Sequence, residues 1–351
     1  MATANFSNIC ISGIACAVPK NVVDNDTYSS TLGDLEVKKF IENTGVKKRY
    51  VSHSKQTTSD LCYEAASKLL KHKEHDSESI DALIFISQTP DYIQPATSHI
   101  LQKRLGLAKS CMCLDVNLGC SGYVYGMFLA SSLIQSGAVD RVLLLVGDIL
   151  RKNPVTEIKD QMLFGDAGSA TIVERGENTV QGILNANGEG YTSLITPGAG
   201  TRRVLKEEES YWEITKPEME GSEVFEFTIK EIPKIFKQFF NTFDKHIDDF
   251  DYCILHQANL FMLKHIGKKI KVQPEKLPIS IDRYGNTNGA SIPMTIVDLC
   301  DLENISKNVK LISSGFGIGL SWGIISFEVE GKDVLPMIYT DNYYEEAYLG
   351  K

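Results

Sequence analysis

Short apolar runs that alternate with helical patterns constrain the fold of this 351-residue chain more than any other feature. The expected strands are 9–14, 82–87, 111–116, 142–146, 170–173, 252–255, 309–313 and 323–329. The expected helices are 59–72, 96–105, 121–135, 225–244, 260–270 and 292–300. Strands without polar alternation belong to a sheet that is covered on both faces. The alternation of strands and helices therefore predicts a layered α/β fold.

A weak internal repeat is present. Residues 81–91 (DALIFISQTPD) and 251–259 (DYCILHQAN) each begin with an acidic residue, continue as an apolar strand and end in a polar turn. Residues 142–173 and 309–329 resemble each other in the same way. The repeat predicts a chain built from two similar halves.

The expected halves are residues 1–175 and 176–330. They meet near 175–220, a stretch rich in Gly, Glu and Lys that we expect to form loops. Residues 331–351 are an acidic, tyrosine-rich extension. A solvated tail is the first expectation for it, because termini are often poorly ordered. The alternative is a flap that docks on the body or on a partner subunit.

Charge and hydropathy exclude several classes of protein. The chain has 36 basic and 45 acidic residues, which gives a formal net charge of −9. This balance argues against a general nucleic-acid binder, which shows a basic footprint. The longest purely apolar runs, Val142–Val146 among them, have five residues, far fewer than the roughly 20 of a membrane-spanning helix. No Lys or Arg precedes Lys20, so the charged region of a signal peptide is missing.

The eight cysteines are scattered and form no C-x-x-C pair. A chain of this length needs no disulfide framework, and the spacing does not suit a structural zinc site. We therefore expect no metal, and we expect mostly buried thiols in a reducing, cytoplasmic compartment.

One cysteine stands where an expected strand gives way to an expected helix. In residues 115–123 (DVNLGCSGY), Cys120 directly precedes the helical pattern. The macrodipole and the free N–H groups of a helix N-terminus favour a thiolate over a thiol. Because the thiolate is the nucleophilic form, Cys120 is a candidate nucleophile. A small buried structural thiol is the alternative.

Two other segments place polar side chains at turns. His256, in residues 254–259 (ILHQAN), follows an expected strand, in the crevice position typical of α/β sites. An imidazole there can act as a base or as a hydrogen-bond donor, and a satisfied core histidine is the alternative. Residues 284–293 (YGNTNGASIP) predict a tight loop that enters a helix. Asn286 offers an amide donor in this loop, and an ordinary turn is the alternative.

A glycine-rich loop occupies residues 313–323 (SSGFGIGLSWG) between two apolar runs. Glycines let the backbone N–H groups of Gly317, Ile318 and Gly319 approach a substrate oxygen closely. The loop is not a dinucleotide fingerprint, because a strand rather than a helix follows it. No cofactor is expected.

In this order and spacing, the four elements resemble the β-ketoacyl-acyl-carrier-protein synthase III family of thiolase-fold condensing enzymes. The segment Thr44–Val46, the turn Gly165–Gly168 and the ending Ser321–Gly323 fit the same pattern. The resemblance runs over about residues 8–329. It implies a five-layered α-β-α-β-α fold made of two duplicated halves, and a homodimer.

The resemblance also implies roles for single residues. Cys120 accepts the acyl group, His256 and Asn286 bind the thioester carbonyl of the malonyl substrate, and the backbone N–H groups of Cys120 and of 317–319 hold the oxyanion. Asn288, at a position where the family has a serine-type residue, receives no role.

The reaction that the resemblance implies is a decarboxylative Claisen condensation. An acyl-CoA or acyl-ACP primer is joined to a malonyl thioester, expected to be malonyl-ACP, where ACP is the acyl carrier protein. One alternative is transfer of the acyl group from Cys120 to an alcohol or amine. Another is a non-catalytic partner subunit of a different synthase.

The sequence departs from the pattern of the acetyl-CoA-primed members. Lys39 stands near the position of a tryptophan and Asn43 at that of an arginine, both of which help to clamp the CoA adenine. A second clamping arginine is replaced around Ile158. These changes indicate a divergent member that takes its acyl group from a carrier protein or another thioester.

The expected substrate and carrier contacts differ from the family pattern as well. Ile318 replaces a glycine of the glycine-rich loop, and Phe261 replaces an arginine that helps to dock the carrier. The candidate pocket residues are Ile93, Gln94, Phe261 and Phe316, of which Ile93 and Gln94 stand where an aromatic from the partner subunit usually caps the acyl site. The candidate carrier-docking residues are Lys264, Lys268 and Lys269, since a small basic patch can steer an acidic carrier.

Overall fold

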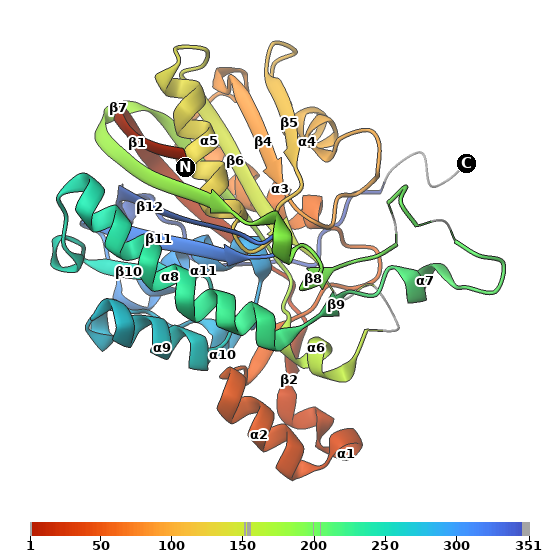
Figure 1. Cartoon of the computed structure of the whole chain (residues 1–351). Helices are drawn as coiled ribbons and strands as arrows, with labels where there is room; N and C mark the ends of the chain where they lie inside the picture. The colour runs from red at the N-terminus through yellow and green to blue at the C-terminus, as the bar shows by residue number, and fades with distance from the viewer. Residues whose placement is uncertain (1, 151, 153–155, 199, 204, 346–351) are drawn as a thin grey trace.

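One mixed sheet runs through the molecule in the computed structural model, which describes residues 2–150, 152, 156–198, 200–203 and 205–345 (Figure 1). Within these residues the sheet has nine strands in the order β10-β11-β12-β1-β7-β6-β4-β5, with β13 paired to β1. The strands are β1 (Ala2–Val18), β4 (Ala82–Ile86), β5 (Met112–Val116), β6 (Arg141–Asp148), β7 (Ala167–Ala186), β10 (Tyr252–Leu255), β11 (Asn308–Gly317), β12 (Ser321–Glu330) and β13 (Ile338–Tyr339). Two short ribbons pair β2 (Val22–Asp24) with β3 (Lys48–Tyr50) and β8 (Leu194–Ile195) with β9 (Glu218–Met219).

Helices form the remaining layers. They are α1 (Ser29–Leu32), α2 (Asp34–Thr44), α3 (Thr58–His72), α4 (Thr97–Leu105), α5 (Gly122–Gln135), α6 (Ile158–Leu163), α7 (Tyr211–Ile214), α8 (Gly221–Phe243), α9 (Leu260–Ile270), α10 (Ile281–Tyr284) and α11 (Ser291–Glu303). Helices α3 and α4 cover one outer face, α5 and α11 lie in the middle, and α8 and α9 cover the other outer face. Strands β4 and β6 pack between α3 and the middle helices, and β11 and β12 pack between the middle helices and α8, so the two ends of the sheet supply two β layers. The predicted five-layered α/β fold is confirmed.

The duplication is visible in the pairing of the strands. In the N-terminal part β4 and β6 are parallel, and β7 runs antiparallel beside β6. In the C-terminal part β10 and β11 are parallel, and β12 runs antiparallel beside β11. The long strands β1 and β7 pair with each other over most of their length, and both also contact β12. These two strands therefore join the halves into one body.

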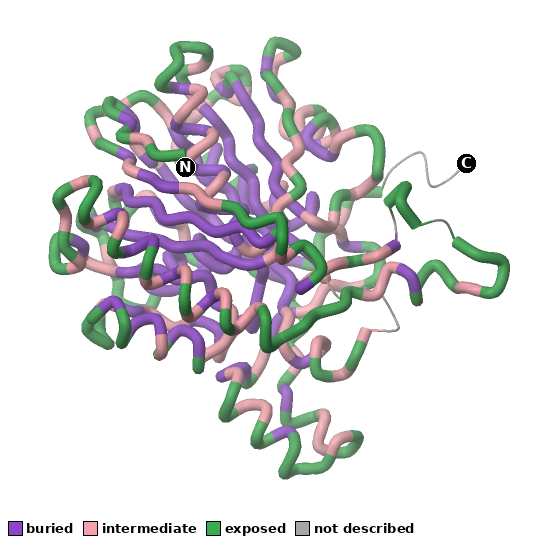
Figure 2. The backbone as a smooth tube through the Cα atoms, in the orientation of Figure 1, coloured by how far each residue is buried: buried purple, intermediate pink, exposed green. Residues whose placement is uncertain are grey.

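Burial explains why the apolar runs form the central strands. All five residues of β4 are buried, as are seven of the eight in β6, so both lie in the purple interior of Figure 2. Burying one such aliphatic side chain stabilises the fold by about 1.5–3 kcal/mol. Each predicted strand and helix is present, and most extend beyond their predicted ends.

Two predictions outside the core differ from the structure. Residues 175–186 belong to β7 rather than to a loop, because this stretch pairs antiparallel with the first residues of β1, and exposed residues alternate with partly buried ones over 175–179. The solvated-tail expectation is wrong for residues 331–345. Gln56 Nε2 donates to the carbonyl oxygens of Thr340 and Asn342, at 3.1 and 3.0 Å, and the Arg104 guanidinium lies over the Tyr344 ring. The end of the extension, 346–351, lies outside the described residues.

Candidate active site

Cys120 lies in the turn between the end of β5 and the first residue of α5. Strand β11 passes directly beside it. A Cβ atom at Gly317 would stand 2.6 Å from Cys120 Cβ and 2.9 Å from its sulfur, so only glycine permits this approach. Cys120 is partly exposed as a residue, whereas its thiol is buried.

Asn288 provides the side chain that contacts the thiol. Cys120 Sγ donates to Asn288 Oδ1 at 2.9 Å, and the Asn288 backbone N–H donates to Asn286 Oδ1, also at 2.9 Å. Asn288 has a φ of 51°, a left-handed conformation that asparagine tolerates better than most residues. The sequence analysis placed Asn286 in the site and left Asn288 without a role. The only sequence signal for Asn288 is its position in a tight Asn-Gly turn.

His256 is held between β10 and α11. Its backbone N–H donates to Ser314 O at 2.9 Å, and its Nδ1 lies 2.7 Å from Ser291 Oγ. The Phe316 ring packs edge-on against the imidazole, with 5.4 Å between the ring centroids. Nδ1 is engaged with Ser291, and the backbone carbonyl of Asn288 also forms a hydrogen bond with the imidazole.

Burial controls the charges of the two titratable candidates. It lowers the pKa of His256 to about 3, so the imidazole is neutral at physiological pH. Burial and, to a smaller extent, the nearby Asp148 carboxylate raise the pKa of Cys120 to about 12. The backbone N–H groups of Ile318 and Cys120 act in the opposite direction. The expectation of a thiolate at rest, drawn from the start of the helix, is therefore wrong for the free protein, because burial outweighs these N–H groups.

Asp148, at the end of β6, is a buried residue that the sequence analysis missed. Its Oδ1 accepts from the backbone N–H of Gln88 at 2.7 Å and from Ser87 Oγ at 3.1 Å. Its Oδ2 accepts from Asn288 Nδ2 at 2.9 Å. Burial raises the pKa of Asp148 and the hydrogen bonds from Gln88 and Ser87 lower it, which leaves the pKa raised to about 7. An acidic residue at the end of a buried strand was the only available signal.

The structure brings some of the other predicted residues to this site and leaves others on the surface. Phe316 lies against His256, and Gly317 and Ile318 lie against Cys120. Within the single chain, Ile93 is 88% exposed and Gln94 is also exposed. The remaining pocket and docking candidates lie on the outer surface of α9, namely Phe261, Lys264, Lys268 and Lys269.

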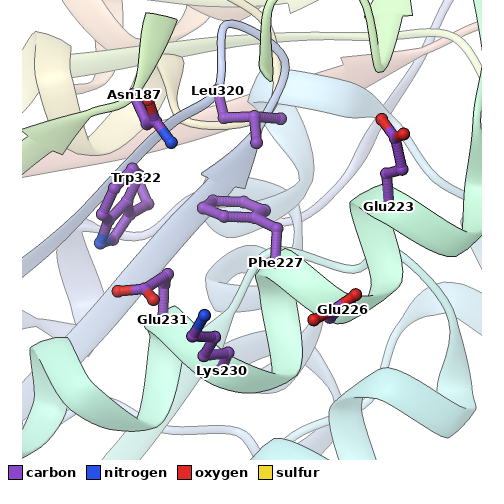
Figure 3. A pocket seen from close by; sticks show the side chains of 8 residues that line it. All are labelled: Asn187, Glu223, Glu226, Phe227, Lys230, Glu231, Leu320 and Trp322. Carbon is purple, nitrogen blue, oxygen red and sulfur yellow. The ribbon is translucent and has the colours of Figure 1, made fainter. Parts of the chain in front are cut away.

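A groove of about 490 Å³ opens between α8 and the loop that precedes β12 (Figure 3). Its lining residues are Asn187, Glu223, Glu226, Phe227, Lys230, Glu231, Leu320 and Trp322. None of the three catalytic candidates lines this groove. Among the described residues, no group of His, Cys, Asp or Glu side chains could hold a metal ion. No described helix is long and apolar enough to span a membrane.

Comparisons with known proteins place the chain in a family. Residues 114–190 match the family model "3-Oxoacyl-[acyl-carrier-protein (ACP)] synthase III", and residues 243–329 match the model of its C-terminal part. The chain is 32% identical to the β-ketoacyl-[acyl-carrier-protein] synthase III of Streptococcus gordonii, over 90% of this chain and 97% of that protein. The chain belongs to the β-ketoacyl-[acyl-carrier-protein] synthase III family.

Further relatives agree with this family. The putative 3-oxoacyl-[acyl-carrier-protein] synthase 3 of Campylobacter jejuni is 32% identical, over 95% of this chain and 98% of that protein. The crystal structure of a 3-oxoacyl-(acyl-carrier protein) synthase from Burkholderia xenovorans is 36% identical, with a TM-score of 0.90. That comparison covers 97% of this chain and 99% of the other. At identities of about a third, this chain is a divergent synthase III.

Proposed function

We propose that this synthase III catalyses a decarboxylative Claisen condensation between an acyl primer held on Cys120 and malonyl-ACP. One observation carries the proposal: Asn288 contacts both the Cys120 thiol and the Asn286 side chain, and the backbone carbonyl of Asn288 also acts on His256. The nucleophile and two candidate donors thus meet around one residue.

The first half-reaction is acyl transfer. Cys120 Sγ attacks the carbonyl carbon of an acyl thioester, a new carbon–sulfur bond forms, and the donor thiol leaves with the proton. The backbone N–H groups of Cys120 and Ile318 would bind the oxyanion, since both already face the sulfur.

The second half-reaction is decarboxylation and attack. Neutral His256 and Asn286 donate hydrogen bonds to the malonyl thioester carbonyl, and the enolate forms as carbon dioxide leaves. One preorganised donor of this kind is worth about 3 kcal/mol. The enolate carbon attacks the acyl-Cys120 ester, and the sulfur leaves and takes up a proton. The product is a β-ketoacyl thioester.

The test is to incubate the protein with acyl-CoA or acyl-ACP donors and with malonyl-ACP, and to follow both products. We expect carbon dioxide and β-ketoacyl-ACP in equal amounts, only when a primer and malonyl-ACP are both present. Transfer of the acyl group to an alcohol or amine without carbon dioxide would instead establish the acyltransferase alternative. A protein that accepts no primer would fit a non-catalytic subunit.

We also propose that the carrier docks on α9. Lys264, Lys268 and Lys269 are exposed on this helix, and Phe261 beside them is 58% exposed. An apolar contact framed by basic side chains suits an acidic carrier surface.

Replacing Lys268 and Lys269 together by Glu is expected to raise the KM for malonyl-ACP by about tenfold, with little change in kcat, because rim charges mainly affect encounter. Steady-state kinetics at low salt would measure this effect. The matched control is the double Glu replacement of Lys68 and Lys71, which are exposed on α3 in the opposite outer layer. Equal effects of the two pairs would contradict docking on α9.

A homodimer is supported by the exposed edge of the sheet. Strand β5 pairs on one side only within the described residues, and its Met112 and Leu114 side chains are 39% and 38% exposed. The exposed Ile93 is available to contact a second copy. Light scattering is expected to give about twice the chain mass of 39.0 kDa, and a monomeric mass would refute the dimer.

We place the protein in the cytoplasm. The eight cysteines are all unpaired, as is usual in a reducing compartment. Cell fractionation tests this location, and recovery outside the cytoplasmic fraction would overturn it.

A further inference from the structure

The Asn288 amide is held on both of its ends. Its Oδ1 accepts from Cys120 Sγ at 2.9 Å, while its Nδ2 donates to Asp148 Oδ2 at 2.9 Å and to Gln88 Oε1 at 3.3 Å. The residue is 3% exposed, so water does not compete freely for these contacts.

Asp148 decides which end of the amide faces the sulfur. Above its pKa of about 7 the Asp148 carboxylate is ionised and only accepts hydrogen bonds, so the amide then turns its NH2 group toward Asp148. Asp148 Oδ1 is already occupied by Ser87, Gln88 and Thr89, at distances of 2.7–3.3 Å, which leaves Oδ2 for Asn288. Because Asn288 Nδ2 donates to Asp148, Asn288 Oδ1 is the atom that faces Cys120. This oxygen can accept a hydrogen bond from the thiol. It has no hydrogen to donate, so it cannot stabilise a thiolate.

We propose that Asp148 and Asn288 are positioning residues for Cys120: Asp148 orients the Asn288 amide with its oxygen toward the sulfur, which keeps the proton on the nucleophile until an acyl donor enters. The proposal rests on the proposed function only in taking Cys120 as the nucleophile. Hydrogen bonds then run from the Cys120 sulfur through the Asn288 amide to the Asp148 carboxylate, and they connect the two halves of the molecule.

The surroundings of the two titratable groups agree with this role. The groups that face the thiol are the Asp148 carboxylate, the backbone N–H groups of Ile318 and Cys120, and the Asn288 amide. His256 in the same site is neutral at physiological pH. The Asp148 carboxylate also acts on the buried thiol of Cys62 from α3. Asp148 is therefore the anion whose removal should increase the thiolate share of Cys120.

The test is the pH dependence of Cys120 alkylation by iodoacetamide, measured on the Cys120 peptide because the chain has eight cysteines. In the Asp148→Asn protein, the charge is lost and the Asn288 amide can turn its NH2 toward the sulfur. We expect the profile to move at least one pH unit lower, which gives about tenfold faster alkylation at pH 8. Asn288→Gly, which keeps the left-handed backbone, is expected to move the profile in the same direction.

Asp115→Asn is the matched control. Asp115 accepts from the backbone N–H groups of Thr97 and Ser98, so its replacement also removes a carboxylate that is hydrogen-bonded to backbone. Its alkylation profile should match that of the wild type. If folded Asp148→Asn and Asn288→Gly proteins both keep the wild-type profile, the proposal is overturned. Alkylation needs no acyl donor, so this result is independent of whether condensation is observed.

Discussion

Replacing Cys120 by Ala is expected to abolish acylation of the protein and to lower condensation by about a thousandfold or more, the usual scale for loss of a covalent nucleophile. The methyl group of Ala cannot form a thioester, and Cys120 is the cysteine whose sulfur bonds to Asn288 and lies beside Gly317. The structure should survive, because Gly317 packs against Cys120 Cβ, which Ala retains.

Intact-protein mass after incubation with a panel of acyl-CoA and acyl-ACP donors measures this directly. Cys113→Ala is the control, since Cys113 is also an unpaired and partly buried cysteine but lies on β5. Wild type and Cys113→Ala should gain the mass of one acyl group, and the best donor would identify the primer class. Acylation that persists in the Cys120→Ala protein would remove Cys120 from its proposed role.

Replacing His256 or Asn286 by Ala is expected to leave acylation of Cys120 within a few-fold of wild type and to slow decarboxylation by about 10²–10³. Neither side chain has a hydrogen bond to Cys120 among the described residues. The Asn286 amide and the His256 imidazole can each donate a hydrogen bond to the malonyl carbonyl. Removing one such donor weakens binding of the enolate without removing the nucleophile.

Two separate assays are needed to see this division: acyl transfer by protein mass, and carbon dioxide release from malonyl-ACP on pre-acylated protein. Ser291→Ala is an informative comparison, because it removes the partner of His256 Nδ1 but keeps the imidazole, and a smaller loss is expected. Equal loss of both half-reactions in His256→Ala would contradict the assigned roles.

Because burial lowers the pKa of His256 to about 3, protonation of this residue should not reduce decarboxylation between pH 8 and pH 5.

The core elements could be predicted because their patterns are local. Continuous apolar runs become the buried strands β4 and β6, and the motif 254–259 ends β10 and starts α9, where Asn259 Oδ1 caps the Met262 N–H at 2.8 Å. Cys120, His256 and Asn286 were identified for the same reason, since each occurs in a short motif at the end of a strand or in a turn.

Polar segments were less predictable, because their structure depends on distant partners. The start of β1 is largely exposed and the second half of β7 is only partly buried, and they are strands because they pair with each other. The extension after residue 330 docks because Gln56, Asp60 and Arg104 contact it, and none of these residues is near it in sequence.

The sequence by itself determined the alternation of strands and helices, the two similar halves and the three catalytic candidates, because short-range patterns encode them. Only the tertiary structure decided the protonation of the site and the contact between Asn288, Cys120 and Asp148. These three side chains come from segments separated by 28 to 168 residues, and pairing across such distances depends on how the two halves pack. The burial that opposes a thiolate at Cys120 arises from the same packing.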